Sequence, residues 1–251
     1  MQQKKNESKV FTLSLPRGKI YDANIESKQL QENIPLLVYL PASFSENEKY
    51  SLIIVQDGKD YFQLGKLTRY ADELIDQGSL EKTIIVATHY KSVQDRRHKY
   101  HPSGEENLKF MEFIADELIP WIEQHYPTYS LREKRTLMGD SLAGTVSLRS
   151  ALYYPELFKN IILHSPYVNE KILDEVESAP SVFNFNIYHV VGKEESVVKV
   201  SNNRDFLTPN RELHQLFIEK GYDIFYEEFN GGHSWKYWQP EVKRALQTMF
   251  S

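Results

Sequence analysis

The 251-residue sequence contains no cysteine and no long apolar run. Without cysteine the chain can form no disulfide, no thiolate metal site and no cysteine nucleophile. No apolar run approaches the roughly 18 residues that a membrane-spanning helix needs. The first residues, MQQKKNESK, lack the apolar segment of a secretory signal peptide, so the cytoplasm is the expected location. A secreted protein whose signal peptide has been removed would show the same N-terminal pattern, so this alternative stays open.

The chain also lacks any excess of positive charge, because its formal net charge is −5 at pH 7. That balance argues against nucleic acid as a partner. The length suits one α/β domain or two small ones, and no repeat, low-complexity tract or linker divides it. Hydrophobic residues make up 41% of the chain, enough for a sizeable core. We predict a single domain over residues 1–251, and the sequence does not indicate its oligomeric state.

Short apolar segments alternate with helix-like segments along the chain. The predicted strands are residues 34–40, 50–55, 83–88, 136–138, 160–164, 186–191 and 222–229. The predicted helices are residues 64–78, 108–125 with a kink at Pro120, the segment that follows Ser141, 210–221 and 240–250. Continuous apolar strands alternating with helices are typical of a mostly parallel sheet covered by helices on both faces, so we predict an α/β fold.

Other segments have weaker patterns, and each yields one expectation. We expect an edge strand at residues 9–15, a hairpin turn at 21–33, a loop at 56–60, an irregular basic loop at 92–102, a helix-capping box at 103–106 and a small cap over the site at 167–185. The capping box rests on the sequence SGEE, in which the serine and the second glutamate would satisfy free N–H groups.

Residues 139–144 read GDSLAG, between a short apolar run and a helix-like segment that ends before Pro155. A serine at a tight turn from a strand into a helix is the nucleophile elbow of α/β-hydrolases. Such a turn strains the backbone of Ser141 and needs small residues two positions away on either side, here Gly139 and Ala143. The common motif has glycine where Ala143 stands, so an ordinary helix start remains the alternative at this point.

A serine nucleophile needs a base to take its proton and a third group to orient that base. In α/β-hydrolases the chain order is serine, acid, histidine. Among the histidines well beyond Ser141, His189 falls in a predicted buried strand and His214 falls inside a helix. His233 instead follows two glycines after the last strand, where a loop can bring its imidazole over the sheet edge. We therefore predict His233 as the base.

The acid and the oxyanion donors are expected in loops at the same sheet edge. Glu194 and Glu195 both follow the penultimate strand, and spacing alone does not choose between them. One oxyanion donor is the backbone N–H of Leu142, directly after the nucleophile. The second is expected around Gly58 and Lys59, where glycine would let the backbone approach the substrate. A plain Asp-Gly turn is the alternative for that segment.

The chain resembles the bacterial putative esterase family, which includes esterase D, feruloyl esterases and enterochelin esterases. The matching segments, in the family's order, are VQDGKDYF at 55–62, DRRHKY at 95–100 with Pro102, FIADELIP at 113–120, GDSLAG at 139–144, Ser165-Pro166, 192–195 and GGHSWKYW at 231–238. The resemblance implies a serine carboxylic-ester hydrolase with the α/β-hydrolase fold, an acyl-enzyme intermediate and no cofactor. Its partner would be a small-molecule ester, with neither nucleic acid nor a membrane involved.

The resemblance also implies which glutamate is the acid. In the family the acid is the third residue after the glycine that ends the strand, which selects Glu195 over Glu194. Some siderophore esterases work with a serine and a histidine alone, so a dyad of Ser141 and His233 stays open. Relatives often carry a second glycine where this chain has Ala143.

The basic segment 95–101, DRRHKYH, suggests the substrate. Arg96 and Arg97 suit planar oxyanions and aromatic faces, so we predict an anion or catecholate clamp, with a solvated loop as the alternative. A metal site at His98 and His101 lacks a carboxylate at ligand spacing, so no metal is predicted. The favoured substrate is a siderophore-type lactone. The alternatives are an acetyl or feruloyl ester, or a non-catalytic binding module on the same fold.

Overall fold

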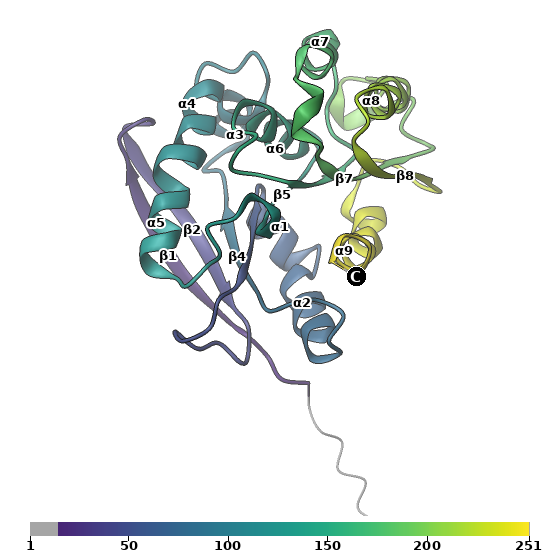
Figure 1. Ribbon diagram of the computed structural model, residues 1–251. Helices are drawn as coiled ribbons and strands as arrows, with labels where there is room; N and C mark the ends of the chain where they lie inside the picture. The colour runs from purple at the N-terminus through teal and green to yellow at the C-terminus, as the bar shows by residue number, and fades with distance from the viewer. Residues whose placement is uncertain (1–14, 251) are drawn as a thin grey trace, which may run out of the picture.

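A computed structural model describes residues 15–250, and the edge strand expected at 9–15 falls almost wholly outside them. The described chain forms one sheet in the order β1-β2-β4-β3-β5-β6-β7-β8 (Figure 1). The strands are β1 Lys19–Ser27, β2 Glu32–Leu40, β3 Ser51–Val55, β4 Thr83–Thr88, β5 Arg135–Asp140, β6 Asn160–His164, β7 Asn186–Gly192 and β8 Asp223–Phe229. β2 runs antiparallel to both of its neighbours, β1 and β4, and all pairs from β4 to β8 are parallel, as predicted.

Helices cover both faces of this sheet. They are α1 Gly58–Gln63, α2 Leu67–Asp76, α3 Val93–Tyr100, α4 Asn107–Glu112, α5 Ile119–His125, α6 Ser141–Tyr153, α7 Glu170–Ser178, α8 Leu207–Glu219 and α9 Trp235–Phe250. Helices α2 and α9 pack together on one face, while α4 to α8 cover the other (Figure 1). Each face has its own apolar core against the buried central strands. No helix in residues 15–250 is long and apolar enough to cross a membrane.

The hairpin turn expected at residues 21–33 is wrong in extent, because β1 continues to Ser27 and the turn between β1 and β2 spans only residues 28–31. β1 is an edge strand that pairs only with β2, and most of its side chains are exposed. Ile25 is its one buried large apolar residue, so the strand lacks the alternation of polar and apolar residues that would reveal it. Backbone pairing along the whole length of β2, from Lys19 opposite Leu40 to Ser27 opposite Glu32, holds it in place.

The irregular basic loop expected at 92–102 is also wrong, because it is the helix α3. The side chain of Ser92 caps this helix by accepting a hydrogen bond from the backbone N–H of Asp95 (3.1 Å). Lys99 is buried and pairs with both Asp95 (2.5 Å) and Glu32. The helix therefore packs through capping and ion pairs rather than through an apolar stripe, and an apolar stripe is what helical periodicity detects.

Four further local expectations differ from the structure. The loop at 56–60 becomes α1 from Gly58 onward. The capping box at 103–106 does not form, since Glu106 caps α4 without any side-chain bond. In place of a kink at Pro120, a π-helical turn at Phe113–Leu118 joins α4 to α5. The supposed cap at 167–185 contains α7, which packs against α6 and α8 in the helical layer.

Candidate active site

Ser141, Glu195 and His233 lie just beyond the carboxyl ends of β5, β7 and β8, respectively. Because these strands are parallel, their carboxyl ends meet at one edge of the sheet, where open α/β sheets place their ligand sites. The sheet thus brings together residues that lie up to 92 positions apart in the chain.

The turn at Ser141 has the geometry expected of a nucleophile elbow. Ser141 is the first residue of α6 and adopts a left-handed conformation, with a φ of 49°. The turn brings Gly139 so close to the backbone of Ala143 that a Cβ on Gly139 would lie 2.3 Å from it. A side chain at position 139 would therefore force the turn open. The strain on a non-glycine residue at positive φ is typical of functional sites.

His233 joins the serine to the glutamate. Its Nε2 lies 3.0 Å from Oγ of Ser141, and its Nδ1 lies 2.7 Å from Oε2 of Glu195. The ring packs between Phe206 and Trp238, with ring centroids 4.3 and 4.7 Å away. These apolar contacts restrict the imidazole to the plane in which both of its nitrogens find a partner.

Glu195 is fully buried, whereas Glu194 is exposed. The second carboxylate oxygen of Glu195 accepts hydrogen bonds from the hydroxyl of Ser165 (2.7 Å) and the backbone N–H of Gly192 (2.9 Å). Ser165 in turn accepts a bond from the indole N–H of Trp238 (3.0 Å). This network holds the carboxylate toward His233. Sequence reasoning missed the role of Ser165.

The predicted oxyanion donors lie in the first turns of two helices. Leu142 is the second residue of α6, and Gly58 and Lys59 begin α1. N–H groups in a first helical turn have no acceptor within the helix, so they are free to bind an oxyanion. The missing side chain of Gly58 faces β4, where a Cβ would lie 2.2 Å from that of Ala87. Glycine therefore lets α1 approach the sheet, which differs from the expected approach to substrate.

The guanidinium of Arg96 is held by hydrogen bonds to other groups of the protein. Its Nε and Nη2 lie 2.8 and 2.5 Å from one carboxylate oxygen of Asp57, the residue before Gly58. Nη2 also lies 3.5 Å from the backbone oxygen of Asp140, the residue before Ser141. The arginine thus connects the turn that leads into α1 with the nucleophile elbow. Asp57 has a left-handed backbone (φ 56°), so its conformation needs such support.

Two buried acids lie beside Arg96, Asp57 and Asp140, and only Asp57 has an ion pair to balance its charge among the described residues. Burial raises the pKa of Asp140, and the neighbouring carboxylate of Asp57 raises it further. Burial also raises the pKa of Asp57, although the guanidinium of Arg96 opposes this. The ion pair with Arg96 therefore favours the charged form of Asp57, whereas Asp140 has no ion-pair partner among the described residues, and burial favours its neutral form.

A cavity of about 250 Å³ opens beside Ser141. Its lining comes from α3, the elbow, the start of the segment after β6 and the loop before α8: Val93, Arg96, Arg97, His101, Ser141, Leu142, Tyr167, Val200, Ser201, Asn202, Arg204 and Phe206. The predicted clamp residues Arg96 and Arg97 both border it. No carboxylate lines it within the part of the chain that the structure describes.

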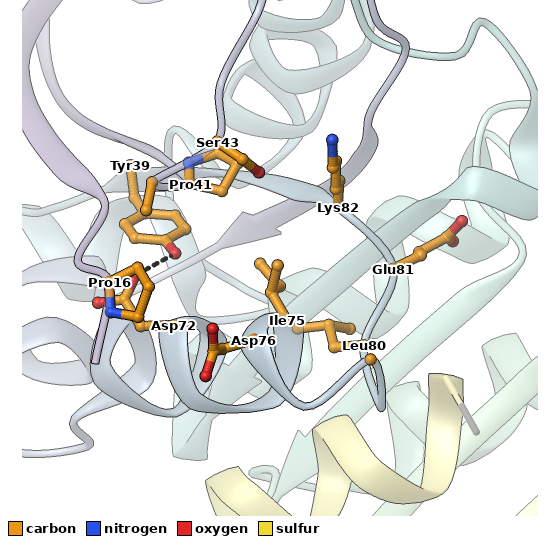
Figure 2. A pocket seen from close by; sticks show the side chains of 12 residues that line it. Pro16, Tyr39, Pro41, Ser43, Asp72, Ile75, Asp76, Leu80, Glu81 and Lys82 are labelled. Carbon is orange, nitrogen blue, oxygen red and sulfur yellow. Dashed lines mark hydrogen bonds between the residues drawn. The ribbon is translucent and has the colours of Figure 1, made fainter. Parts of the chain in front are cut away.

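A larger cavity, of about 470 Å³, lies between the end of β2 and α2 (Figure 2). Tyr39 and Asp72 bond to each other across it at 2.7 Å. Its lining includes neither a histidine nor any residue of the Ser141 site. The smaller cavity, which borders Ser141 and its hydrogen bond to His233, is therefore the better candidate for chemistry. Residues 15–250 contain no group of three or more histidines and acids placed to hold a metal ion.

Similar proteins are found by sequence and by structure. A family model described as "Putative esterase" matches residues 27–249. The chain is 44% identical over 234 residues to "Uncharacterized protein YjcH" of Bacillus subtilis (strain 168), covering 92% of this chain and 98% of that protein. It is 25% identical over 267 residues to an acetyl esterase of Caldicellulosiruptor saccharolyticus, covering 92% and 97% of the two chains.

One solved structure shares the fold closely. An enterochelin esterase from Shigella flexneri superimposes with a TM-score of 0.80 at 16% identity, over 92% of this chain and 58% of that one. At this identity the likeness shows the fold alone. The α/β-hydrolase fold predicted from the sequence is thereby confirmed.

Proposed function

We propose, for a chain that belongs to the putative esterase family and is a carboxylic ester hydrolase, that hydrolysis runs through Ser141, His233 and Glu195. The observation that carries the proposal is the continuous chain of hydrogen bonds, 3.0 Å from Ser141 to His233 and 2.7 Å from His233 to Glu195. Both distances are within direct hydrogen-bonding reach, which proton transfer from the nucleophile to its base requires.

The mechanism follows from these contacts. Oγ of Ser141 attacks the ester carbonyl carbon while its proton passes to Nε2 of His233. The bond from the carbonyl carbon to the alcohol oxygen then breaks, and His233 returns the proton to that oxygen. Water attacks the acyl-enzyme by the same route, which releases the acid and restores Ser141. Glu195 keeps the proton of the neutral imidazole on Nδ1 and stabilises the imidazolium when it forms.

The oxyanion of each tetrahedral intermediate needs N–H donors on the side away from His233. We assign these to the backbone of Leu142 and to the Gly58–Lys59 turn. Leu142 lines the cavity next to Ser141, and α1 is tied to the elbow through Asp57 and Arg96. Donors fixed in this way need no rearrangement when charge develops, which is the source of their effect.

For the substrate we propose a siderophore-type catecholate ester, on the strength of the arginines that border the cavity. A pocket of about 250 Å³ is below the roughly 300–1,000 Å³ usual for drug-sized ligands, so it would take one arm of a trilactone. A small acetyl or feruloyl ester is the second candidate, favoured by the same small volume. A non-catalytic module on this fold would need neither the nucleophile nor its base.

The test begins with a fluorophosphonate probe and 4-nitrophenyl acetate. We expect the probe to label the protein at Ser141, and Ser141→Ala to lower kcat by on the order of 10⁶-fold. Labelling of the alanine variant at the unchanged rate would refute the assignment. A panel of catecholate lactones, acetyl esters and feruloyl esters then ranks the substrate candidates by kcat/KM.

The neighbouring glutamates provide a matched pair for the acid. We expect Glu195→Gln to lower kcat by roughly 10⁴-fold, because an amide would favour the wrong tautomer of His233. Glu194→Gln should change it little, since that side chain is exposed and does not contact the histidine. The reverse ranking would reassign the acid to Glu194. Little effect from either change would point to a dyad of Ser141 and His233.

A further inference from the structure

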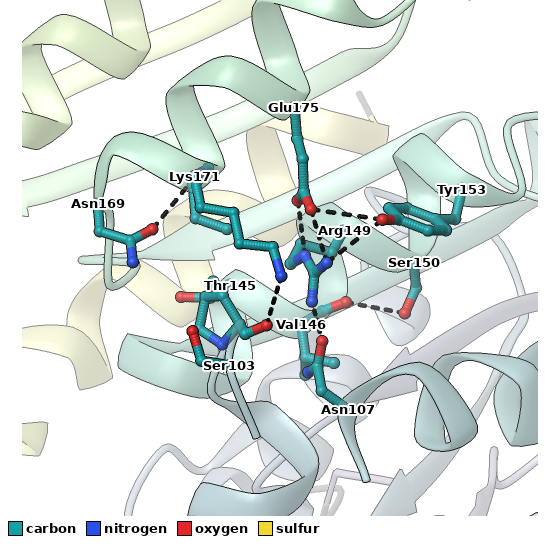
Figure 3. A network of polar contacts seen from close by, with 12 residues as sticks. Ser103, Asn107, Thr145, Val146, Arg149, Ser150, Tyr153, Asn169, Lys171 and Glu175 are labelled. Carbon is teal, nitrogen blue, oxygen red and sulfur yellow. Dashed lines mark hydrogen bonds and ion pairs between the residues drawn. The ribbon is translucent and has the colours of Figure 1, made fainter. Parts of the chain in front are cut away.

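Three cations surround the outer part of the Ser141 cavity without a carboxylate to balance them. Arg97 and Arg204 line the cavity, and the charge of Lys171 reaches the lining residue His101, whose pKa it lowers. Within residues 15–250 none of the three forms an ion pair, and the guanidinium of Arg97 has no hydrogen-bond partner there. The ammonium of Lys171 binds only the backbone oxygen of Pro102 (2.8 Å; Figure 3). In a chain whose net charge is −5, such an unbalanced cluster is unexpected.

The two arginines come from different elements and are held by different means. Arg97 belongs to α3, whereas Arg204 belongs to a loop that pairs back on Val198 through the bond from the N–H of Val198 to the oxygen of Arg204 (2.8 Å). The guanidinium of Arg204 lies over the ring of Tyr167, 4.7 Å from its centroid, and also donates to its hydroxyl. Its remaining N–H groups have no protein acceptor in the described chain.

An aromatic wall connects these cations to the reacting atoms. Phe206 packs on His233 with centroids 4.3 Å apart, Tyr167 packs on Phe206 at 6.1 Å, and His101 packs on Tyr167 at 5.1 Å. The backbone N–H of Tyr167 also bonds to the carbonyl oxygen of Ser141 (3.1 Å). A ligand that lies against this wall therefore reaches from the nucleophile to the arginines.

His101 completes the group of donors. Its Nδ1 accepts a hydrogen bond from the backbone N–H of Ser103 (3.1 Å), so the proton of the neutral ring is on Nε2. Burial, and then the charges of Arg97, Arg204 and Lys171, lower the pKa of His101 and keep the ring neutral. The ring supplies an N–H donor without adding a fourth positive charge.

We propose that Arg97 and Arg204 form an anion-binding subsite that holds a carboxylate-bearing arm of a small ester while Ser141 attacks its carbonyl. This inference rests on the proposed hydrolysis at Ser141 and concerns the small-ester candidate, which it narrows to esters with one compact negative group. Arginine is suited to this role because its planar fork binds a carboxylate through two parallel hydrogen bonds. The small cavity excludes a bulky acid, and the aromatic wall favours a flat or slender one.

The experiment compares two pairs of esters, each with an anionic and a neutral member. One pair places the charge on the acyl side: mono(4-nitrophenyl) glutarate and neutral 4-nitrophenyl valerate, which have acyl chains of equal length. The other places it on the alcohol side: 4-carboxyphenyl acetate and neutral 4-acetylphenyl acetate. The measured quantity is the ratio of kcat/KM for the anionic ester to kcat/KM for the neutral one, after subtraction of spontaneous hydrolysis.

We expect a ratio of about 10 or more in at least one pair, as a charge-assisted hydrogen bond provides. Arg97→Gln and Arg204→Gln should each lower that ratio by about 10-fold. Arg69→Gln is the control, because it removes one positive charge from an exposed site on α2, away from this cavity. Arg204→Lys keeps the positive charge but lacks the planar guanidinium, so its ratio should lie between those of the wild type and Arg204→Gln.

The outcomes separate this inference from the proposed function. A wild-type protein that hydrolyses the neutral esters with a ratio near one overturns the subsite and leaves the serine mechanism standing. An equal fall of the ratio in Arg69→Gln would assign the preference to the overall charge and would also overturn the subsite. Failure to hydrolyse any of the four esters, together with no probe labelling at Ser141, would overturn both proposals.

Discussion

Arg96 and Arg97 are neighbours in the sequence, yet we expect their replacement to have different kinetic consequences. Arg96 is held by Asp57 through two short contacts to one oxygen, and Tyr90 and Tyr100 lie near its guanidinium, with centroids 5.8 and 5.7 Å away. Arg97 is exposed and makes no such bonds. We therefore predict that Arg96 positions the oxyanion donors, while Arg97 contacts the substrate.

The size of the expected loss of stability follows from the burial of the Arg96–Asp57 ion pair. Only 3% of the Asp57 side chain and 19% of the Arg96 side chain are exposed. Removing one partner of a buried ion pair costs roughly 3–5 kcal/mol, because the other charge is left in a poor environment. Arg96→Gln should therefore lower the melting temperature clearly. Loss of one oxyanion donor costs about 10²–10³ in kcat, which bounds the kinetic effect if the turn at Gly58 shifts.

The assay measures kcat and KM on the neutral valerate ester and on the glutarate monoester. For Arg96→Gln we expect kcat to fall by about 10²-fold on both esters while KM changes little, because the donors act on the transition state. Arg96→Lys keeps the positive charge without the planar guanidinium, so its kcat should lie between those of the wild type and Arg96→Gln. Arg97→Gln is the matched comparison, and its main effect should be confined to the charged ester.

The reasoning would be refuted by a selective effect of Arg96→Gln. If that variant hydrolysed the neutral ester with normal kcat and failed only on the charged one, Arg96 would be a substrate ligand and its pair with Asp57 would be incidental. A variant that melts normally would also contradict the prediction, since it would show that Asp57 does not depend on the ion pair.

Two further predictions concern stability. Arg149 is fully buried and binds Glu175 through two bonds of 2.6 Å (Figure 3), so Arg149→Ala should cost about 3–5 kcal/mol in the free energy of unfolding. Arg211→Ala breaks a similarly two-pronged but exposed pair with Glu228, so it should cost far less. Urea unfolding of both variants checks this, and equal losses would contradict it. Burial lowers the pKa of His189 to about 4, against 6.5 for an exposed histidine, so as the pH falls the unfolded chain takes up a proton first. This contribution to stability is complete above pH 6.5 and is lost between pH 6.5 and 4, by roughly 3 kcal/mol in total. Between those pH values the free energy of unfolding of His189→Gln should therefore fall by roughly 3 kcal/mol less than that of the wild type.

Segments with a strong local signal were predictable. The run YSLIIV covers β3 and the residue before it, TIIVAT is the buried strand β4, and the strand predicted at 160–164 has the bounds of β6. The motif GDSLAG predicted a turn in which Ser141 is strained, and its φ of 49° agrees. The family resemblance read from the motifs is confirmed by the family model. In each case the information lies within a few consecutive residues.

Segments stabilised by distant partners were not predictable. β1 shows no alternation because only its pairing with β2 defines it, and α3 shows no apolar stripe because Lys99 packs through ion pairs. The role of Ser165 depends on Glu195 and Trp238, which lie 30 and 73 residues away. Periodicity reports which residues are buried, and it does not report which polar groups meet.

By itself the sequence determined the alternation of strands and helices, the serine at its tight turn and the histidine behind its two glycines. These are local properties, since the size of neighbouring residues and the spacing of apolar ones decide them. Spacing alone did not separate Glu195 from Glu194; the family resemblance favoured Glu195, and in the tertiary structure Glu195 faces His233. Only the tertiary structure decided that Arg96 is held by Asp57 and that a loop more than a hundred residues beyond α3 brings Arg204 to the same cavity. The physical reason is that adjacent side chains point in different directions, and which of them finds a partner depends on how the parallel strands and their loops converge at one edge of the sheet.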